Sequence, residues 1–110
     1  MISMSVDSRR RCELPSRPGV QVLVGGRLVR ARQRPFALGA ENVPSRVIRP
    51  GRGAWALVRF ANYCGGPGAV SLRITIGGHT IARRVPDAVP PVCSSRASPP
   101  SLRVSLFVRR

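Results

Sequence analysis

The sequence has no lysine, few acidic residues and few aromatic side chains, and each scarcity narrows the functions that it can support. The aromatic fraction is only 5%, too small both to fill a core and to line a stacking groove for nucleic-acid bases. No apolar run approaches the ~20 residues that a membrane-spanning helix needs. Paired-carboxylate catalysis would have to draw on four acidic residues outside apolar stretches, namely Asp7, Glu13, Glu41 and Asp87.

What is present suits one small β-rich domain. The 110 residues are 43% hydrophobic, mostly through Val, Leu and Ile, and include 11 glycines and 11 prolines without a regular period. Frequent Gly and Pro between short apolar stretches are typical of many turns that join short strands. We therefore predict a single β domain over residues 12–110, preceded at 1–11 by a basic segment that is either a disordered arm or a strand remnant.

The stretch around which the rest is organised is VIRPGRGAWALVRFANYC, residues 47–64. A Pro50-Gly51 turn leads into residues 54–61, where apolar side chains occupy both alternating sets of positions. A strand that is apolar on both faces is typical of the centre of a sheet with cover on either side. We predict a central strand here, with Trp55 and Phe60 in the core.

The strands predicted on either side are antiparallel and short. The Gly25-Gly26 pair indicates a tight hairpin, because glycine readily adopts the positive φ angles of a primed turn. Residues 32–44 have no clear period and are predicted as a loop. The fold class that follows is an all-β, immunoglobulin-like antiparallel β-sandwich of about six to seven strands. Besides the central strand, the predicted strands are 20–24, 27–31, 46–49, 70–76, 79–85 and 102–109.

Three cysteines and one histidine lack the spacing of a zinc site, and no metal or other cofactor is predicted. Cys64 and Cys93 each lie where a strand gives way to a loop, so we predict a structural disulfide between them, which is typical of proteins outside the cytosol. Cys12 is left as a free or unpartnered thiol. The chain contains the residue types of a nucleophilic set in Cys64, His79 and Asp87, but nothing around Cys64 resembles a thiol-enzyme signature. We therefore predict no catalytic residues.

The net charge of +15 comes entirely from arginine. One explanation is GC-rich coding, which favours Arg, Ala, Gly, Pro and Val together. The other is a basic stripe across one sheet that binds anionic wall polymers, lipid headgroups or nucleic acid through phosphate contacts. The candidate residues for such a stripe fall at outward strand positions and in turns: Arg27, Arg30, Arg59, Arg73, Arg83 and Arg103.

From Cys12 onward, the order of several short motifs resembles a known family. These are CEL at 12–14, PGV at 18–20, the Gly-Gly hairpin, IRPG at 48–51, FANYC at 60–64, VSLRI at 70–74, PPVC at 90–93 and a closing LRV at 102–104. That order is similar to the domain of unknown function 4232 family, which is common in secreted proteins and lipoproteins of high-GC Gram-positive bacteria. The resemblance implies an immunoglobulin-like sandwich without assigned catalysis. It also implies that an N-terminal strand and a partner for Cys12 are missing from this copy.

The function expected from these observations is non-enzymatic: a secreted or cell-envelope module with a structural or interaction role. Its partner is not identified by the sequence, and cell-wall or envelope components are the candidates. The alternative is an arginine-rich domain that binds nucleic acid or another anionic polymer. MISMSVDS at the N-terminus has no apolar signal-peptide region. We therefore expect an extracellular or envelope location for a full-length form, and a cytoplasmic one if Met1 is the genuine start.

Overall fold

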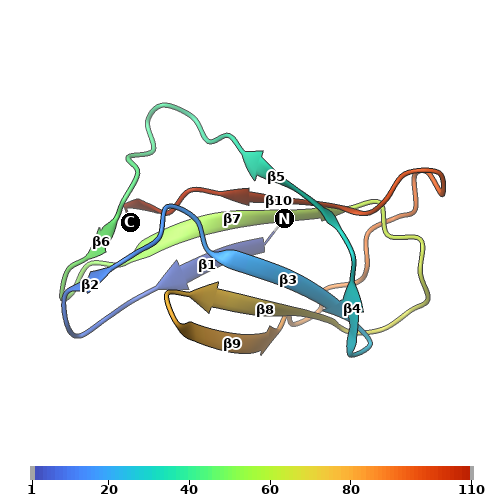
Figure 1. The fold of residues 1–110 in the computed structure, drawn as a ribbon, viewed down its shortest axis with the longest axis horizontal. Coiled ribbons are helices and arrows are strands. Elements are labelled where there is room, and N and C mark those ends of the chain that lie inside the picture. Colours follow the sequence, from blue (N-terminus) through green and yellow to red (C-terminus); the bar gives the residue numbers. More distant parts are fainter. Residues whose placement is uncertain (1, 110) are drawn as a thin grey trace.

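A computed structural model describes residues 2–109, and all of its regular structure is β (Figure 1). The described part measures 43 × 28 × 23 Å along its principal axes. The all-β prediction is confirmed, although the strands are more numerous than predicted. They are β1 (Ile2–Val6), β2 (Cys12–Glu13), β3 (Gly19–Val24), β4 (Arg27–Val29), β5 (Arg32–Phe36), β6 (Val47–Ile48), β7 (Ala54–Ala61), β8 (Val70–Ile76), β9 (His79–Arg84), β10 (Ser101–Ser105) and β11 (Val108–Arg109).

Two larger sheets carry the fold, and a two-stranded β2–β6 pair lies at one end (Figure 1). The first sheet has the order β1-β7-β10-β5, with β11 continuing the pairing along β7. The second sheet has the order β4-β3-β8-β9. Most pairings are antiparallel, but β10 and β5 run parallel. The prediction of a wholly antiparallel arrangement is therefore wrong for this pair.

The two sheets share one apolar core. On β7, Ala54, Ala56 and Val58 point inward and have no exposed surface, and the small alanines let the facing sheet approach closely. Val22 and Leu72 supply the facing side from β3 and β8. Because successive residues of a strand point to opposite faces, one alternating set from each strand builds this core.

The outer face of β7 is only partly covered, which corrects the prediction of a strand buried on both sides. On this face Trp55 and Leu57 are half-buried and Arg59 is exposed. Phe60 lies on the opposite, inward face, where it is half-buried and packs against the core as predicted. Trp55 is therefore not a core residue; its indole Nε1 donates a hydrogen bond to the carbonyl of Arg109, 3.2 Å away. Such a position is common for tryptophan, whose ring packs on apolar surface while its N–H reaches a polar partner.

The predicted Gly25-Gly26 hairpin forms, and Gly77-Gly78 joins the predicted strands 70–76 and 79–85 in a second hairpin. Gly25 and Gly26 have φ angles of 58° and 79°, and Val24 pairs with Arg27 across the turn. Positive φ at both central positions is the primed turn whose twist matches the flanking strands. The second hairpin pairs Ile76 with His79 across Gly77-Gly78.

β1 lies in the segment for which a disordered arm or a strand remnant was predicted, and β5 lies where a loop was predicted. β1 pairs with β7 and buries Met4 between half-buried Ile2 and Val6, so residues 2–6 are a strand and not a disordered arm. Its alternation of apolar residues with serine is the signal that identifies it. β5 falls inside the predicted loop at 32–44; it has an arginine-rich sequence with Pro35 and is held by its pairing with β10. Proline is tolerated on an edge strand of this kind.

A β-bulge interrupts the last predicted strand. Val104 pairs with Val58, whereas Val108 pairs with Trp55, so three residues at 105–107 lie opposite two residues of β7. One extra residue reverses the alternation. Phe107 consequently points into the core with no exposed surface, while Leu106 is only half-buried. A regular alternation continued from Leu102 and Val104 would place Leu106 inward and Phe107 outward, and the bulge reverses this order.

Candidate functional site

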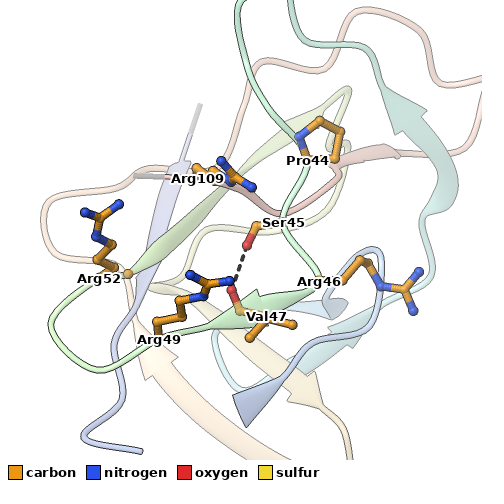
Figure 2. Close-up of a pocket in the computed structure, with 8 residues that line it drawn as sticks. Pro44, Ser45, Arg46, Val47, Arg49, Arg52 and Arg109 are labelled. Carbon is orange, nitrogen blue, oxygen red and sulfur yellow. Dashed lines mark hydrogen bonds between the residues drawn. The ribbon is translucent and has the colours of Figure 1, made fainter. Parts of the chain in front are cut away.

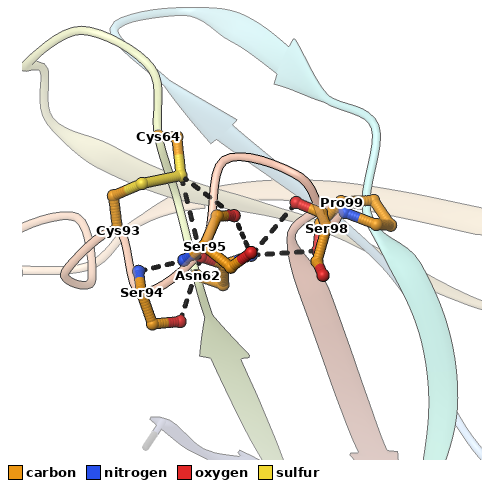
Figure 3. The surroundings of a disulfide bond; sticks show 7 residues. All are labelled: Asn62, Cys64, Cys93, Ser94, Ser95, Ser98 and Pro99. Carbon is orange, nitrogen blue, oxygen red and sulfur yellow. Dashed lines mark hydrogen bonds between the residues drawn. A yellow bond between two sulfur atoms is a disulfide. The ribbon is translucent and has the colours of Figure 1, made fainter.

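The predicted disulfide joins the end of β7 to the Pro/Ser-rich connection before β10 (Figure 3). Cys64 and Cys93 are bonded, with their Cα atoms 4.7 Å apart and a sequence separation of 29 residues. This prediction is confirmed. The bridge ties the long 86–100 connection to the central strand of the first sheet.

Asn62 anchors the same connection beside the bridge (Figure 3). Its Oδ1 accepts hydrogen bonds from the backbone N–H groups of Ser94 and Ser95 at 2.9 and 2.8 Å. Its Nδ2 donates toward the carbonyls of Ser95, Ser98 and Pro99 at 3.0 to 3.3 Å. Asn62 has a φ of 58°, a conformation that asparagine tolerates better than most residues. The sequence contains no local pattern that predicts this role.

Cys12 and His79 do not form a reactive group with the residues around the disulfide. Cys12 is exposed, with its Sγ 3.2 Å from the hydroxyl of Ser8. His79 is exposed at the start of β9. Because Cys64 is held in the disulfide, the set of Cys64, His79 and Asp87 has no thiol to act as a nucleophile. Within residues 2–109, no group of three or more His, Cys, Asp or Glu side chains could hold a metal ion.

The six candidate arginines do not form one stripe across one sheet. Arg59 and Arg103 are direct partners on β7 and β10 of the first sheet. The others lie on or next to the second sheet: Arg27 at the first hairpin, Arg30 just after β4, Arg73 on β8 and Arg83 on β9. The structure therefore brings together only two of the six.

A third arginine, which the sequence analysis missed, extends that pair into a row. Arg34 on β5 is in register with Arg103 on β10, which in turn is opposite Arg59 on β7. Residues in register on neighbouring strands point to the same face and lie about 5 Å apart. We call Arg34, Arg103 and Arg59 the arginine row. All three are exposed.

A second group of arginines surrounds a cavity of about 260 Å³ near the β2–β6 pair (Figure 2). Arg49 and Arg52 lie on either side of the Pro50-Gly51 turn, and Arg109 comes from β11. Figure 2 shows the Arg46 side chain pointing away from these three; its Nε donates a hydrogen bond to the carbonyl of Leu14. We call Arg49, Arg52 and Arg109 the pocket arginines. None of them was a candidate from the sequence.

Comparison with known proteins does not place this fold or these sites in a described group. No family model, no curated protein and no solved structure matches the chain. Residues 2–109 also contain no helix that is long and apolar enough to cross a membrane.

Proposed function

We propose that this chain forms an immunoglobulin-like β-sandwich of an exported or cell-envelope protein, and that it acts by binding and not by catalysis. The observation that carries the proposal is the Cys64–Cys93 disulfide. Structural disulfides persist in oxidising compartments and are rare in the cytosol. The bridge also consumes the Cys64 thiol that a nucleophilic set of Cys64, His79 and Asp87 would need.

The arrangement of the strands supports the sandwich assignment. Two sheets of four main strands each contribute alternate side chains to one core, as expected for two stacked sheets whose pairings are mostly antiparallel. The order of short motifs from Cys12 to Val104 supports a relationship to the secreted domains of unknown function that the sequence resembles. In this proposal the loops held by Asn62 and the disulfide are a rigid end of the module.

The export proposal predicts the redox state of each cysteine. We expect the chain, fused to an export signal and recovered from the medium of a Gram-positive host, to contain a peptide pair linked through Cys64 and Cys93. Non-reducing peptide mass mapping after alkylation measures this pair directly. Cys12 in the same sample is expected to react with the alkylating reagent, because it is exposed. Finding Cys64 and Cys93 both alkylated in the secreted protein would contradict the export proposal.

A second candidate function is favoured by the arginine row. Like charges directly opposite one another on a sheet repel, and the direct partners of Arg103 on both sides are arginines. An anionic polymer lying across β7, β10 and β5 would relieve this repulsion and contact three guanidinium groups at once. The module would then hold a phosphate-bearing polymer of the cell wall on the outer face of its first sheet.

The polymer proposal predicts a salt-dependent affinity that resides in the row. We expect binding to a poly(glycerol phosphate) chain to weaken steeply with salt, and the variant R34Q/R59Q/R103Q to reduce the slope of log K against log salt by about 2. Fluorescence anisotropy with a labelled polymer measures both quantities, and a single-stranded DNA arm tests the nucleic-acid alternative.

The matched control for this experiment is R27Q/R73Q/R83Q, which removes the same charge from around the second sheet. It is expected to bind nearly as the unmodified chain does. Equal losses in the two variants would mean that only net charge matters. No binding even at low salt would leave coding bias as the account of the arginine content.

A further inference from the structure

The pocket arginines are brought together by three separate features of the backbone. Arg49 and Arg52 form an isolated antiparallel bridge, with the Arg52 N–H donating to the Arg49 carbonyl at 3.0 Å. Gly51 within the turn has a φ of 77°, a conformation that glycine adopts without strain. Directly opposed residues place their side chains on the same face, so the turn presents both guanidinium groups to one side.

The third arginine is positioned by the β-bulge. Arg109 pairs with Ala54 only because the extra residue at 105–107 shifts the register of β11 by one. Its backbone is held at both ends: the N–H donates to the carbonyl of Val43 at 2.8 Å, and the carbonyl accepts from Trp55. The Arg109 side chain is therefore presented beside the turn by a backbone segment that is itself well fixed.

The charges around the cavity are of one sign. Its eight lining residues include four arginines and no acidic residue. Asp7 lines an adjoining hollow together with Ser8, Arg9, Gly51 and Arg52. Three exposed guanidinium groups around one hollow repel each other unless an anion lies between them.

We propose that the pocket arginines form a binding site for a single phosphoryl group, separate from the arginine row and independent of the export proposal. The guanidinium fork matches the geometry of phosphate oxygens and can bind two of them at once. The volume of about 260 Å³ is below the ~300 Å³ at which pockets for drug-sized molecules begin, and suits a phosphate or a small phosphate ester. Free phosphate, a phosphate ester of a small polyol and an anionic lipid headgroup share this chemistry.

The test is phosphate binding at constant ionic strength. We expect the melting temperature of the oxidised chain to rise by about 5 °C when sodium phosphate at roughly tenfold above its Kd replaces sodium chloride. Isothermal titration calorimetry then measures the Kd. In the variant R49Q/R52Q/R109Q we expect the phosphate-dependent shift to disappear and the affinity to fall tenfold or more, because charge-assisted hydrogen bonds are lost.

The matched control is R34Q/R59Q/R103Q, which lowers the net charge by the same amount on the outer face of the first sheet. This control is expected to retain the phosphate-dependent shift. The proposal is overturned if wild-type protein shows no shift with phosphate, or if the two triple variants lose binding to the same degree. Loss of polymer binding in the row variant alone leaves the phosphoryl site standing, so the two proposals fail separately.

Two further arms keep the experiment decisive. If circular dichroism shows that the triple variant is unfolded, the single substitutions R49Q, R52Q and R109Q replace it; wild-type phosphate affinity in all three overturns the proposal.

Glycerol phosphate, and phosphatidylcholine vesicles with and without phosphatidic acid, identify the source of the phosphoryl group. Tighter binding to glycerol phosphate than to inorganic phosphate indicates a soluble or polymer-derived ester, and capture only by the phosphatidate vesicles indicates a lipid surface.

Discussion

Replacing Phe107 with alanine is expected to lower the free energy of unfolding by about 4 kcal/mol. The Phe107 ring is fully buried between the two sheets, and its removal leaves a cavity that the backbone cannot readily close. Its N–H donates to the carbonyl of Ser16 and its carbonyl accepts from Ser45, so the main chain at this position is tied on both sides. Urea denaturation of the oxidised protein, followed by tryptophan fluorescence, measures the change.

The control is the neighbouring substitution Leu106→Ala. Leu106 is half-buried on the other side of the bulged strand, next to the loop at 36–44, and its truncation is expected to cost about 1 kcal/mol. A simple two-residue alternation from Leu102 onward predicts the reverse order, with Leu106 inward and Phe107 outward. A larger loss for Leu106→Ala than for Phe107→Ala would therefore contradict the bulge.

Removing the disulfide with the double substitution C64S/C93S is expected to destabilise the protein by about 3.5 kcal/mol. The physical reason lies in the unfolded chain: the bridge closes a loop of 29 residues, and its loss restores that loop's conformational entropy. In the folded state the hydrogen bonds of Asn62 to the connection at 94–99 remain. The loop should therefore keep its place while the midpoint of urea denaturation falls.

Cys12→Ser is the control for that experiment. Cys12 is exposed and outside the bridge, so its replacement is expected to change stability by no more than about 0.5 kcal/mol. Treating the unmodified protein with a reductant should reproduce the loss seen in C64S/C93S. Equal stability of the oxidised and reduced proteins would show that the bridge contributes nothing to folding.

The parts of the fold that could be predicted are those encoded by neighbours in sequence. The Gly25-Gly26 turn needs only two residues that tolerate positive φ, and the alternation over 70–76 needs only that one face be buried. β5 could not be predicted in this way, because its residues are mostly exposed and its pairing partner, β10, lies about seventy residues further along the chain. The parallel pairing of these two strands is set by the tertiary structure and not by the local sequence of either strand.

The residues of the candidate sites also differ in whether local sequence could predict their grouping. Cys64 and Cys93 were paired because both were expected where a strand gives way to a loop. In the structure Cys64 follows β7, whereas Cys93 lies within the connection between β9 and β10, and the pairing is still correct. The arginine row depends on which residues of three strands fall in register, and Arg34, Arg103 and Arg59 are spread over most of the chain. Arg49 and Arg52 flank a recognisable turn, but nothing local indicates that Arg109 lies beside them.

The amino-acid sequence by itself determined that this protein is β-rich, that it turns at its glycine pairs and that two of its cysteines are placed to bridge, because turns, alternation and strand ends are local properties. Tertiary structure alone decided the register of the strands, the reversal of faces at residues 105–107 and the grouping of the arginines into a row and a pocket. The reason is that a shift of one residue in pairing moves every following side chain to the opposite face of the sheet.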